Sequence, residues 1–314
     1  MSRVLCVILN WRTPEMTLRA ARSALAAMEG IEGAITIVDN DSGDGSFEQM
    51  RAAAAEWPRV QVLQSGRNGG FGAGNNFGIR AGLPDGTQPD FIYVLNSDAF
   101  PAKDAIKQLL SHLIAHPEAG FAGSYIHGED GEPHTTAFRF PSIASEFEGA
   151  AKTGPISRLL KHAIVAPALP EATTRVGWMA GASVLMRREV LDEIGLFDER
   201  FFLYFEETDL CLRATRAGWA MEYVVESRVM HIGSVSTGMR DWARVPDYWF
   251  ASRRYYFEKN HGRLYACMAT AAHMAGLGVY GLRVVLQRKK PHTPPYFARD
   301  LMRHSWRSRK SQES

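Results

Sequence analysis

The first 115 residues alternate four times between a short apolar run and a longer segment with helical spacing. Such runs, without polar alternation, are typical of parallel strands that are covered on both faces. Strands that alternate with helices predict an α/β domain, in which a doubly wound and mostly parallel sheet has helices on both sides. The four expected strands are residues 4–9, 35–38, 60–63 and 91–95.

Beyond residue 115 the pattern is less regular. Residues 127–175 are rich in Gly, Pro and charged side chains, and we expect them to form an irregular insertion. Further strands are expected at 184–186, 221–225 and 228–230, with helices at 188–194 and 206–217. An aromatic and apolar segment follows, so the sheet is expected to have a C-terminal helical extension.

Polar side chains stand where three of these strands end. Asn10, Asp39 and Asp98 each follow an apolar run. In open α/β sheets the ligand binds at the carboxyl ends of the strands, so these residues mark the expected binding edge. Asp and Asn are also common turn and cap residues, which is the structural alternative.

A glycine-rich segment, residues 66–76, precedes one of the expected helices. Gly70-x-Gly72-x-x-Asn75 lacks the third glycine of the dinucleotide fingerprint, and the segment follows the third strand instead of the first. No G-K-[ST] motif occurs, so a P-loop is excluded. The segment is interpreted either as a backbone that approaches phosphate closely or as a flexible turn.

Two sets of side chains could carry chemistry. Asp98 could bind a divalent cation that bridges two phosphates, with His231 at another strand end as a second ligand or as a structural residue. Glu206, Glu207 and Asp209 start a helix, where acids complement the helix dipole. One of them could instead be a general base whose pKa is raised by its neighbours, and the pattern does not separate these readings.

Charge and cysteine content narrow the classes of protein. The net charge of +2 gives no case for nucleic-acid binding. Residues 283–314 carry nine Lys and Arg and two acids, a charge of +7, which leaves −5 on the first 282 residues. Three cysteines without short spacing argue against disulfides and a zinc site, and they predict a cytosolic chain.

Six ordered segments within residues 3–260 resemble inverting family 2 glycosyltransferases of the GT-A fold, in their rhamnosyltransferase-like branch. The segments are VILNWRTPEMTLRAARSAL, IVDNDSGDGS, GRNGGFGAGNNFGIR, YVLNSDAF, WMAGASVLMRREVLDEIGLFDERFFLYFEETDLCLRATRAGW and VMHIGSVS. The resemblance implies a GT-A, Rossmann-like sheet. It also implies a catalytic domain of residues 1–240, with a nucleotide-sugar-binding half (1–98) and an acceptor-binding half (99–240).

The resemblance also implies roles for individual residues. Asn96-Ser97-Asp98 stands at the family's D-x-D motif, with Asn in the first place, so Asp98 and His231 would hold Mg²⁺ or Mn²⁺. Glu207 aligns with the Asp of the family's E-D pair and would be the general base. The nucleotide-sugar donor would lie against Asn10, Asp39, Asn68, Asn76 and Asn96. The acceptor side would be formed by Trp178, Gly181, Glu206 and Asp209.

The function implied is transfer of a sugar, with inversion, from a nucleotide diphosphate to a lipid-linked or polysaccharide acceptor in bacterial surface-glycan synthesis. The expected donor is dTDP-L-rhamnose, with a UDP- or GDP-sugar next. A sugar-nucleotide pyrophosphorylase would need a basic glycine-rich loop after the first strand, where this chain has Asn10-Trp11-Arg12-Thr13. A non-catalytic nucleotide-sugar-binding scaffold could lose Asp98, Glu207 and His231 independently. All three are present in this chain, which favours an enzyme.

The basic C-terminal segment has two interpretations. Residues 264–282 contain no Asp, Glu, Lys or Arg and include three glycines, and the +7 segment follows them. This pattern favours a segment, residues 241–314, that lies on an anionic membrane surface, which would place the protein peripherally on the inner face of the plasma membrane. The alternative is a helical hairpin that packs on the domain or on a second subunit in a homodimer.

Overall fold

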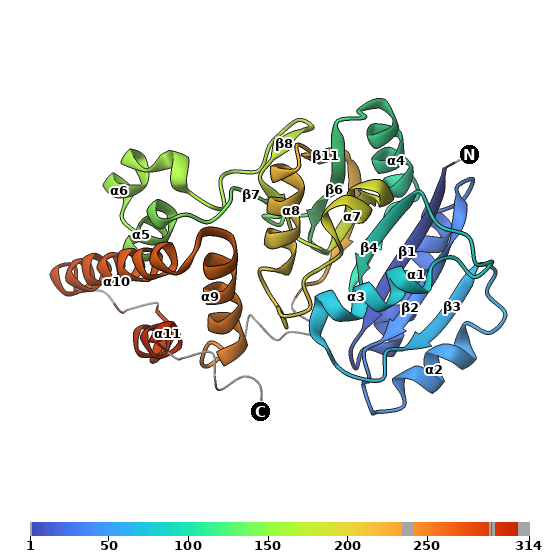
Figure 1. Cartoon of the computed structure of the whole chain (residues 1–314), viewed down its shortest axis with the longest axis horizontal. Coiled ribbons are helices and arrows are strands. Elements are labelled where there is room, and N and C mark those ends of the chain that lie inside the picture. Colours follow the sequence, from blue (N-terminus) through green and yellow to red (C-terminus); the bar gives the residue numbers. More distant parts are fainter. Residues whose placement is uncertain (1, 234–241, 289, 291–292, 307–314) are drawn as a thin grey trace. The chain divides into compact units, whose positions relative to one another are not determined.

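Figure 1 shows the computed structural model, which describes residues 2–233, 242–288, 290 and 293–306. The chain divides into two compact units. Unit 1 consists of residues 1–138, 168–202 and 206–238. Unit 2 consists of residues 139–167, 203–205 and 239–314. The structure therefore groups residues 139–167, which the sequence reading placed in the acceptor-binding half, with the C-terminal helices.

Unit 1 is built on one mixed sheet with strand order β3-β2-β1-β4-β10-β6-β11-β5, and β8 pairs with β11. The first four strands in this order run parallel, and the sheet becomes mixed where β10 pairs antiparallel with β4 and β6. The predicted mostly parallel α/β sheet is thus confirmed. The strands are β1 (Arg3–Asn10), β2 (Glu32–Asp39), β3 (Val60–Gln64), β4 (Phe91–Asn96), β5 (Ala99–Pro101), β6 (Ala119–His127), β8 (Thr174–Val176), β10 (Ser183–Arg187) and β11 (Ala220–His231).

Helices cover both faces of this sheet (Figure 1). Alternate side chains of β1, such as Cys6 and Ile8, share a buried cluster with α1, α2 and α4, while the intervening Val7 and Leu9 face the glycines of α3. Both faces of β1 are therefore apolar, as its continuous run predicts. The helices are α1 (Pro14–Ala27), α2 (Ser46–Ala53), α3 (Gly70–Ala81), α4 (Ala105–Ala115), α7 (Arg188–Ile194) and α8 (Glu206–Arg216).

Two local expectations differ from the structure. Residues 221–225 and 228–230 belong to one strand, β11, whose pairing with β6 shifts register between Val224 and Arg228. Such an irregularity in the pairing interrupts the apolar pattern without ending the strand. The expected irregular insertion contains β7 (Ala137–Phe138), α5 (Ile143–Ala151), α6 (Gly154–Leu159) and a 3-10 turn (Lys161–Ala163), and β7 pairs with β9 (Trp178–Met179).

Unit 2 is helical. Besides α5 and α6 it contains α9 (Asp247–His261), α10 (Arg263–Leu286) and α11 (Phe297–Trp306). Ser142 and Ser145 form a capping box at the start of α5, which explains why a helix begins in a segment of mixed composition. α10 packs against α5, α9 and α11. The predicted C-terminal helical extension is therefore present.

Candidate active site

The first part of the site is the edge of the sheet where β1 and β2 end. Asn10 and Asp39 are direct partners in the parallel register, and both are buried. Asn10 Nδ2 donates to Asp39 Oδ1 over 2.8 Å, and Ser42 donates to the same carboxylate from its Oγ (2.6 Å) and its backbone N–H (3.0 Å). Three donors therefore hold the Asp39 carboxylate in a fixed position at the strand edge.

The second part of the site lies at the end of β4, next to β1. Asn96 ends β4, one strand away from Asn10 in the parallel register, and Asp98 lies two residues further on. His231, the last residue of β11, donates from Nε2 to Asp98 Oδ1 over 3.0 Å, and Asn96 Nδ2 lies 3.4 Å from the same nitrogen. The structure therefore brings together three of the predicted residues from two distant segments.

The environment of Asp98 favours its charged form. Burial opposes ionisation, but the hydrogen bond and charge of His231, with the backbone N–H of Gly233 at 3.1 Å, outweigh it and hold the pKa of Asp98 below its ordinary value. A carboxylate that stays ionised at the strand edge can bind a cation or a hydrogen-bond donor.

These residues fit a divalent cation of the kind that arrives with a diphosphate. Mg²⁺ is usually held by one or two carboxylates plus substrate phosphates. Asp98 and His231, whose Oδ1 and Nε2 atoms lie 3.0 Å apart, supply one carboxylate and one imidazole side by side. Within the described residues, no three His, Cys, Asp or Glu side chains converge on one position. The protein part of such a site would therefore be small, and phosphate and water would supply the remaining ligands.

Glu207 is the third part of the site. It lies in the first turn of α8, and its Oε1 accepts the backbone N–H of Gly181 over 3.2 Å. Burial raises the pKa of Glu207, and the backbone N–H groups of Glu207 itself and Gly181 only partly offset this effect. A carboxyl group with a raised pKa is suited to accept a proton near neutral pH.

Backbone contacts connect Glu207 to the end of β4. Ala182 follows Gly181 in the chain, and its carbonyl accepts the N–H of Asn96 over 3.0 Å. The segment 181–182 therefore touches both the helix that carries Glu207 and the strand that leads to Asp98. A Cβ atom on Gly181 would stand 2.9 Å from Glu207 Oε1 and 2.9 Å from the ring of Phe71, so any larger residue would displace both side chains.

The other acids at the start of α8 are held differently. Glu206 and Asp209 are both buried. Arg213 donates to Asp209 Oδ2 over 2.9 Å and also to the carbonyls of Ile194 and Leu196, so Asp209 orients an arginine that fixes the end of α7. The acceptor-side roles of these residues remain predictions.

Residues 70–76 of the glycine-rich segment lie in a helix, as expected, whereas residues 66–69 form the bend that precedes it. α3 begins at Gly70, and Asn68 Oδ1 just before it accepts the Gly70 N–H (3.1 Å) and Asn40 Nδ2 (2.9 Å). Asn76 is buried on α3 and forms reciprocal hydrogen bonds with the backbone of Phe197. Asn68 therefore connects α3 to the end of β2, whereas Asn76 connects α3 to the segment that follows α7.

Trp178 lies in the small two-stranded sheet of unit 1. Its ring stacks on that of Phe138 with centroids 4.2 Å apart, across the β7–β9 pair. Trp178 is thus half-buried by its stacking on Phe138, three residues before Gly181 in the chain. Its contact with an acceptor stays a prediction.

Sequence reasoning missed two residues of this edge. His134 lies with its ring centroid 6.2 Å from that of His231, and Ser42 holds Asp39 as described above. Ser42 had a usable signal, because Ser is a common turn residue and follows the strand-end Asp39 by three residues in an Asp-rich turn. His134 had none, since only the tertiary structure brings the 127–138 segment beside β11.

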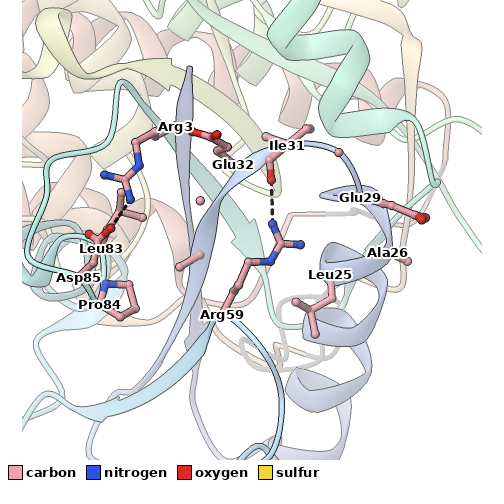
Figure 2. A pocket seen from close by; sticks show the side chains of 13 residues that line it. Arg3, Leu25, Ala26, Glu29, Ile31, Glu32, Arg59, Leu83, Pro84 and Asp85 are labelled. Carbon is pink, nitrogen blue, oxygen red and sulfur yellow. Dashed lines mark hydrogen bonds and ion pairs between the residues drawn. The ribbon is translucent and has the colours of Figure 1, made fainter. Parts of the chain in front are cut away.

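A large cavity lies elsewhere on unit 1. It has a volume of about 1090 Å³ and is lined by the starts of β1 and β2 and the loop after α3 (Figure 2). Figure 2 shows Arg3 directed at Asp85 and Arg59 at the carbonyl of Ile31, so both arginines are paired. This cavity is at the amino ends of the strands, away from Asp39 and Asp98. We assign the candidate site to the carboxyl ends because the chemistry-bearing groups gather there.

Comparison with known proteins agrees with this geometry. The sequence model of "Glycosyltransferase like family 2" matches residues 2–254. N-acetylglucosaminyl-diphospho-decaprenol L-rhamnosyltransferase of Mycobacterium tuberculosis is 30% identical over 260 residues, which are 76% of this chain and 79% of that protein. Rhamnosyltransferase WbbL of Escherichia coli K12 is 27% identical over 166 residues, 52% of this chain and 60% of that protein.

Solved structures are similar in fold. GalNAc-T7, solved with UDP, GalNAc and Mn²⁺, superimposes with a TM-score of 0.58 at 14% identity over 99% of this chain and 55% of that one. Residues 1–349 of S. aureus TarS superimpose with a TM-score of 0.52 at 14% identity, over 91% of this chain and 72% of that one. At such low identity these structural matches show only the fold, which is the GT-A fold. The family follows from the sequence match over residues 2–254: the chain belongs to glycosyltransferase family 2.

Proposed function

We propose that this glycosyltransferase is a metal-dependent inverting enzyme that transfers L-rhamnose from dTDP-rhamnose to a lipid-linked acceptor in bacterial surface-glycan synthesis. Two curated relatives named as rhamnosyltransferases support the sugar, and the name of the mycobacterial one supports a diphospho-polyprenol acceptor. The enzyme would then act in the cytoplasm, at the inner face of the plasma membrane.

The observation that carries the proposal is the position of Glu207. Its carboxyl group is fixed by Gly181, has a raised pKa, and is connected through residues 181–182 to the strand end that bears Asp98. A base and a cation-binding carboxylate on one edge are what a single displacement at the sugar carbon of a nucleotide diphosphate requires.

The chain's own residues then have distinct tasks. Asp39, fixed by Asn10 and Ser42, would accept hydrogen bonds from the nucleotide. The acceptor hydroxyl oxygen attacks the anomeric carbon, the bond from that carbon to the diphosphate oxygen breaks, and Glu207 takes the hydroxyl proton. One such displacement inverts the anomeric centre. A bound Mg²⁺ or Mn²⁺ would supply positive charge for the leaving diphosphate, with Asp98 and His231 as its protein ligands.

The Glu207→Gln variant tests this assignment. The amide keeps the size of the side chain but cannot take a proton, so we expect transfer to fall by ~10²–10⁴-fold while donor binding is retained. Transfer to a diphospho-lipid acceptor and donor affinity would be measured with dTDP-rhamnose. Glu189→Gln, an exposed change on α7, is the matched control and should keep full activity. Near-normal turnover of a folded Glu207→Gln protein would remove Glu207 from this role.

Metal dependence and donor identity need a second experiment. We expect EDTA to abolish transfer and Mn²⁺ or Mg²⁺ to restore it, and Asp98→Ala to raise the metal concentration needed for half-maximal rate. Thermal shifts and hydrolysis of dTDP-rhamnose, UDP-sugars and GDP-sugars would be compared in one panel. A UDP- or GDP-sugar preference would replace rhamnose in the proposal, and binding without transfer to any acceptor would favour a scaffold.

A further inference from the structure

One face of α10 is apolar and exposed along the whole helix. Its exposed positions recur at intervals of four and three residues, and none of them carries a charge: Leu264, Met268, Ala271, Ala275, Gly278, Leu282 and Val285. Leu264 is 75% exposed, Met268 43%, Leu282 63%, and the neighbouring Val285 and Leu286 are each 74% exposed. We call this set the α10 outer face. Soluble proteins rarely leave a contiguous apolar face of this length uncovered unless it binds something.

The opposite face of α10 is packed within unit 2. Ala266, Ala269 and Tyr280 are buried, and α10 runs along α5 so closely that a Cβ atom on Gly276 would stand 2.6 Å from the carbonyl oxygen of Phe147. His273 on this side donates to Glu146 of α5 over 2.6 Å, and Glu146 also pairs with the buried Arg253 at 2.8 Å. Among the described residues, α10 is the one helix long and apolar enough to cross a membrane. Crossing would carry these paired charges into the hydrocarbon, so the packing favours a helix that lies in the interface plane.

The charge of unit 2 indicates what covers the outer face. Its sequence carries 19 Lys and Arg against 7 Asp and Glu, a formal charge of +12, so unit 1 carries −10. Five of these cations and two of the acids lie outside the described residues: Arg240, Lys289, Arg307, Arg309, Lys310, Asp241 and Glu313. Arg263 starts α10, and Arg288 lies just beyond its end, so cationic side chains flank the apolar row.

This charge distinguishes between two occupants. Spacing of four and three residues also suits the seam of a coiled coil with a second copy. Two units of +12 would repel each other along that seam, whereas an anionic bilayer attracts Lys and Arg near its surface. Apolar side chains between flanking cations are typical of helices that lie at the boundary of headgroups and acyl chains.

We infer that the α10 outer face docks on an anionic lipid bilayer, with α10 parallel to the membrane plane and its apolar row in the headgroup–acyl boundary. Docking would bring the enzyme to the lipid-linked acceptor, a purpose that rests on the proposed function. The binding itself can be measured without sugar transfer.

Cys267 provides a probe in the unmodified chain. It is the exposed cysteine on the outer side of α10, whereas Cys6 and Cys211 are buried. The emission of an environment-sensitive fluorophore on Cys267 should shift to the blue when vesicles of phosphatidylcholine with about one third phosphatidylglycerol are added. The shift should be much smaller with pure phosphatidylcholine. The same label on an Ile114→Cys, Cys267→Ser protein, at an exposed site on α4 in unit 1, should not respond.

Vesicle sedimentation of a variant gives the decisive result. Met268→Glu with Leu282→Glu places two carboxylates in the row, and we expect partitioning to anionic vesicles to weaken at least tenfold, with unchanged thermal unfolding. Ile114→Glu is the control for adding a carboxylate at an exposed aliphatic residue and should partition like the wild type. Donor hydrolysis without vesicles should be equal in all three proteins, so a failed docking test and a failed activity test are separate results.

Two outcomes would overturn the inference. One is equal vesicle binding by the double variant and the wild type. The other is a stable dimer of the wild-type protein in solution, by sedimentation equilibrium, that the double variant loses, because the row would then be an interface between two copies.

Discussion

At the residue scale, Glu207 combines a fixed position with a raised pKa. Its neighbours differ from what the sequence suggested, since Asp209 is paired with Arg213 and burial, not carboxylate repulsion, is the main cause of the shift. This has a consequence for pH dependence, because a base must be ionised in order to act.

We expect kcat/KM to fall as the pH is lowered through the raised pKa of Glu207, at a higher pH than an exposed glutamate would give. Because the raised pKa means that the folded state binds the proton more tightly than the unfolded state, the ionised Glu207 lowers stability above that pKa. Glu207→Gln should therefore be at least as stable as the wild type at pH 8, with a difference that shrinks at acid pH. Transfer rates and urea unfolding from pH 5 to pH 9 would measure both effects. A less stable Gln variant at pH 8 would contradict the assigned cause.

Gly181 offers a test of how Glu207 is positioned. In Gly181→Ala the added methyl group meets Glu207 Oε1 and the ring of Phe71, so the carboxyl group must move. Displacement of a catalytic group by about 1 Å can lower the rate ~10²-fold. We therefore expect kcat to fall roughly ten- to a hundredfold, with an unchanged KM for the donor. Gly149→Ala on α5, where a Cβ atom would meet nothing within 4 Å, should leave kcat unchanged. An equal effect in both variants would indicate a general loss of structure.

At the scale of elements, the glycines of α3 serve packing. From the sequence, these glycines could only be shown not to match the dinucleotide-binding fingerprint. In the structure, α3 lies so close to β1 and β2 that a Cβ atom on Gly78 would stand 2.7 Å from Val7 Cγ1 and 2.9 Å from Val38 Cγ2. This close contact brings Asn68 and Asn76 to their partners near the ends of β2 and α7.

Gly78→Ala should destabilise unit 1, since added volume in a packed core costs about 1–3 kcal/mol. Gly149→Ala is again the matched control, and on an exposed helical position it should change stability by less than about 1 kcal/mol, in the stabilising direction. Urea unfolding followed by circular dichroism would compare the two. If both substitutions are stabilising, α3 does not pack on the sheet as closely as described.

Elements in the first third of the chain were predictable because each carries its own pattern. The continuous apolar runs of β1, β2 and β4 and the Pro14 start of α1 are local signals. α5 was missed because its Ser142–Ser145 capping box lies in a segment of turn-forming composition. β11 was divided in two because the polar residues Glu226 and Ser227 lie where its pairing with β6 shifts register, and only that pairing shows that the strand continues.

At the scale of the whole molecule, the chain consists of an acidic α/β unit and a basic helical unit. Unit 2 is held together partly by ionic contacts. Glu146 of α5 meets Arg253 of α9 and His273 of α10, so one carboxylate joins α5 to two consecutive helices that follow it by more than 100 residues.

Removing that carboxylate should be costly. Burial opposes ionisation of Glu146, but the charge of Arg253 and the hydrogen bond of His273 outweigh it and lower its pKa. The stabilisation is thus present above the unfolded pKa and is lost as the pH falls through the lowered folded pKa. We expect Glu146→Gln to destabilise unit 2 by about 3–5 kcal/mol at pH 7, because Arg253 stays buried without its counter-ion.

The control for this change is Glu189→Gln. The exposed Glu189 pairs with Arg187 at 3.6 Å, and Arg187 also donates to the backbone carbonyls of Leu113 and Ala119, so loss of the exposed carboxylate should cost less than about 1 kcal/mol. Thermal unfolding of both variants at pH 7 and pH 4 would be compared. A loss for Glu146→Gln no larger than that of the control would mean that the Glu146 contacts contribute little to the stability of the helical unit.

The sequence by itself determined the parallel strands, the helices between them and the edge that carries Asn10, Asp39 and Asp98, because apolar periodicity and strand-end polarity are local properties of the chain. Only the tertiary structure decided that His231 meets Asp98, that Gly181 holds Glu207, and that residues 139–167 pack with the C-terminal helices. Those contacts join segments between 26 and 133 residues apart in the site and more than 100 apart in unit 2. No local pattern specifies such pairings, since they depend on how strands are ordered in the sheet and on which helix faces remain to be buried.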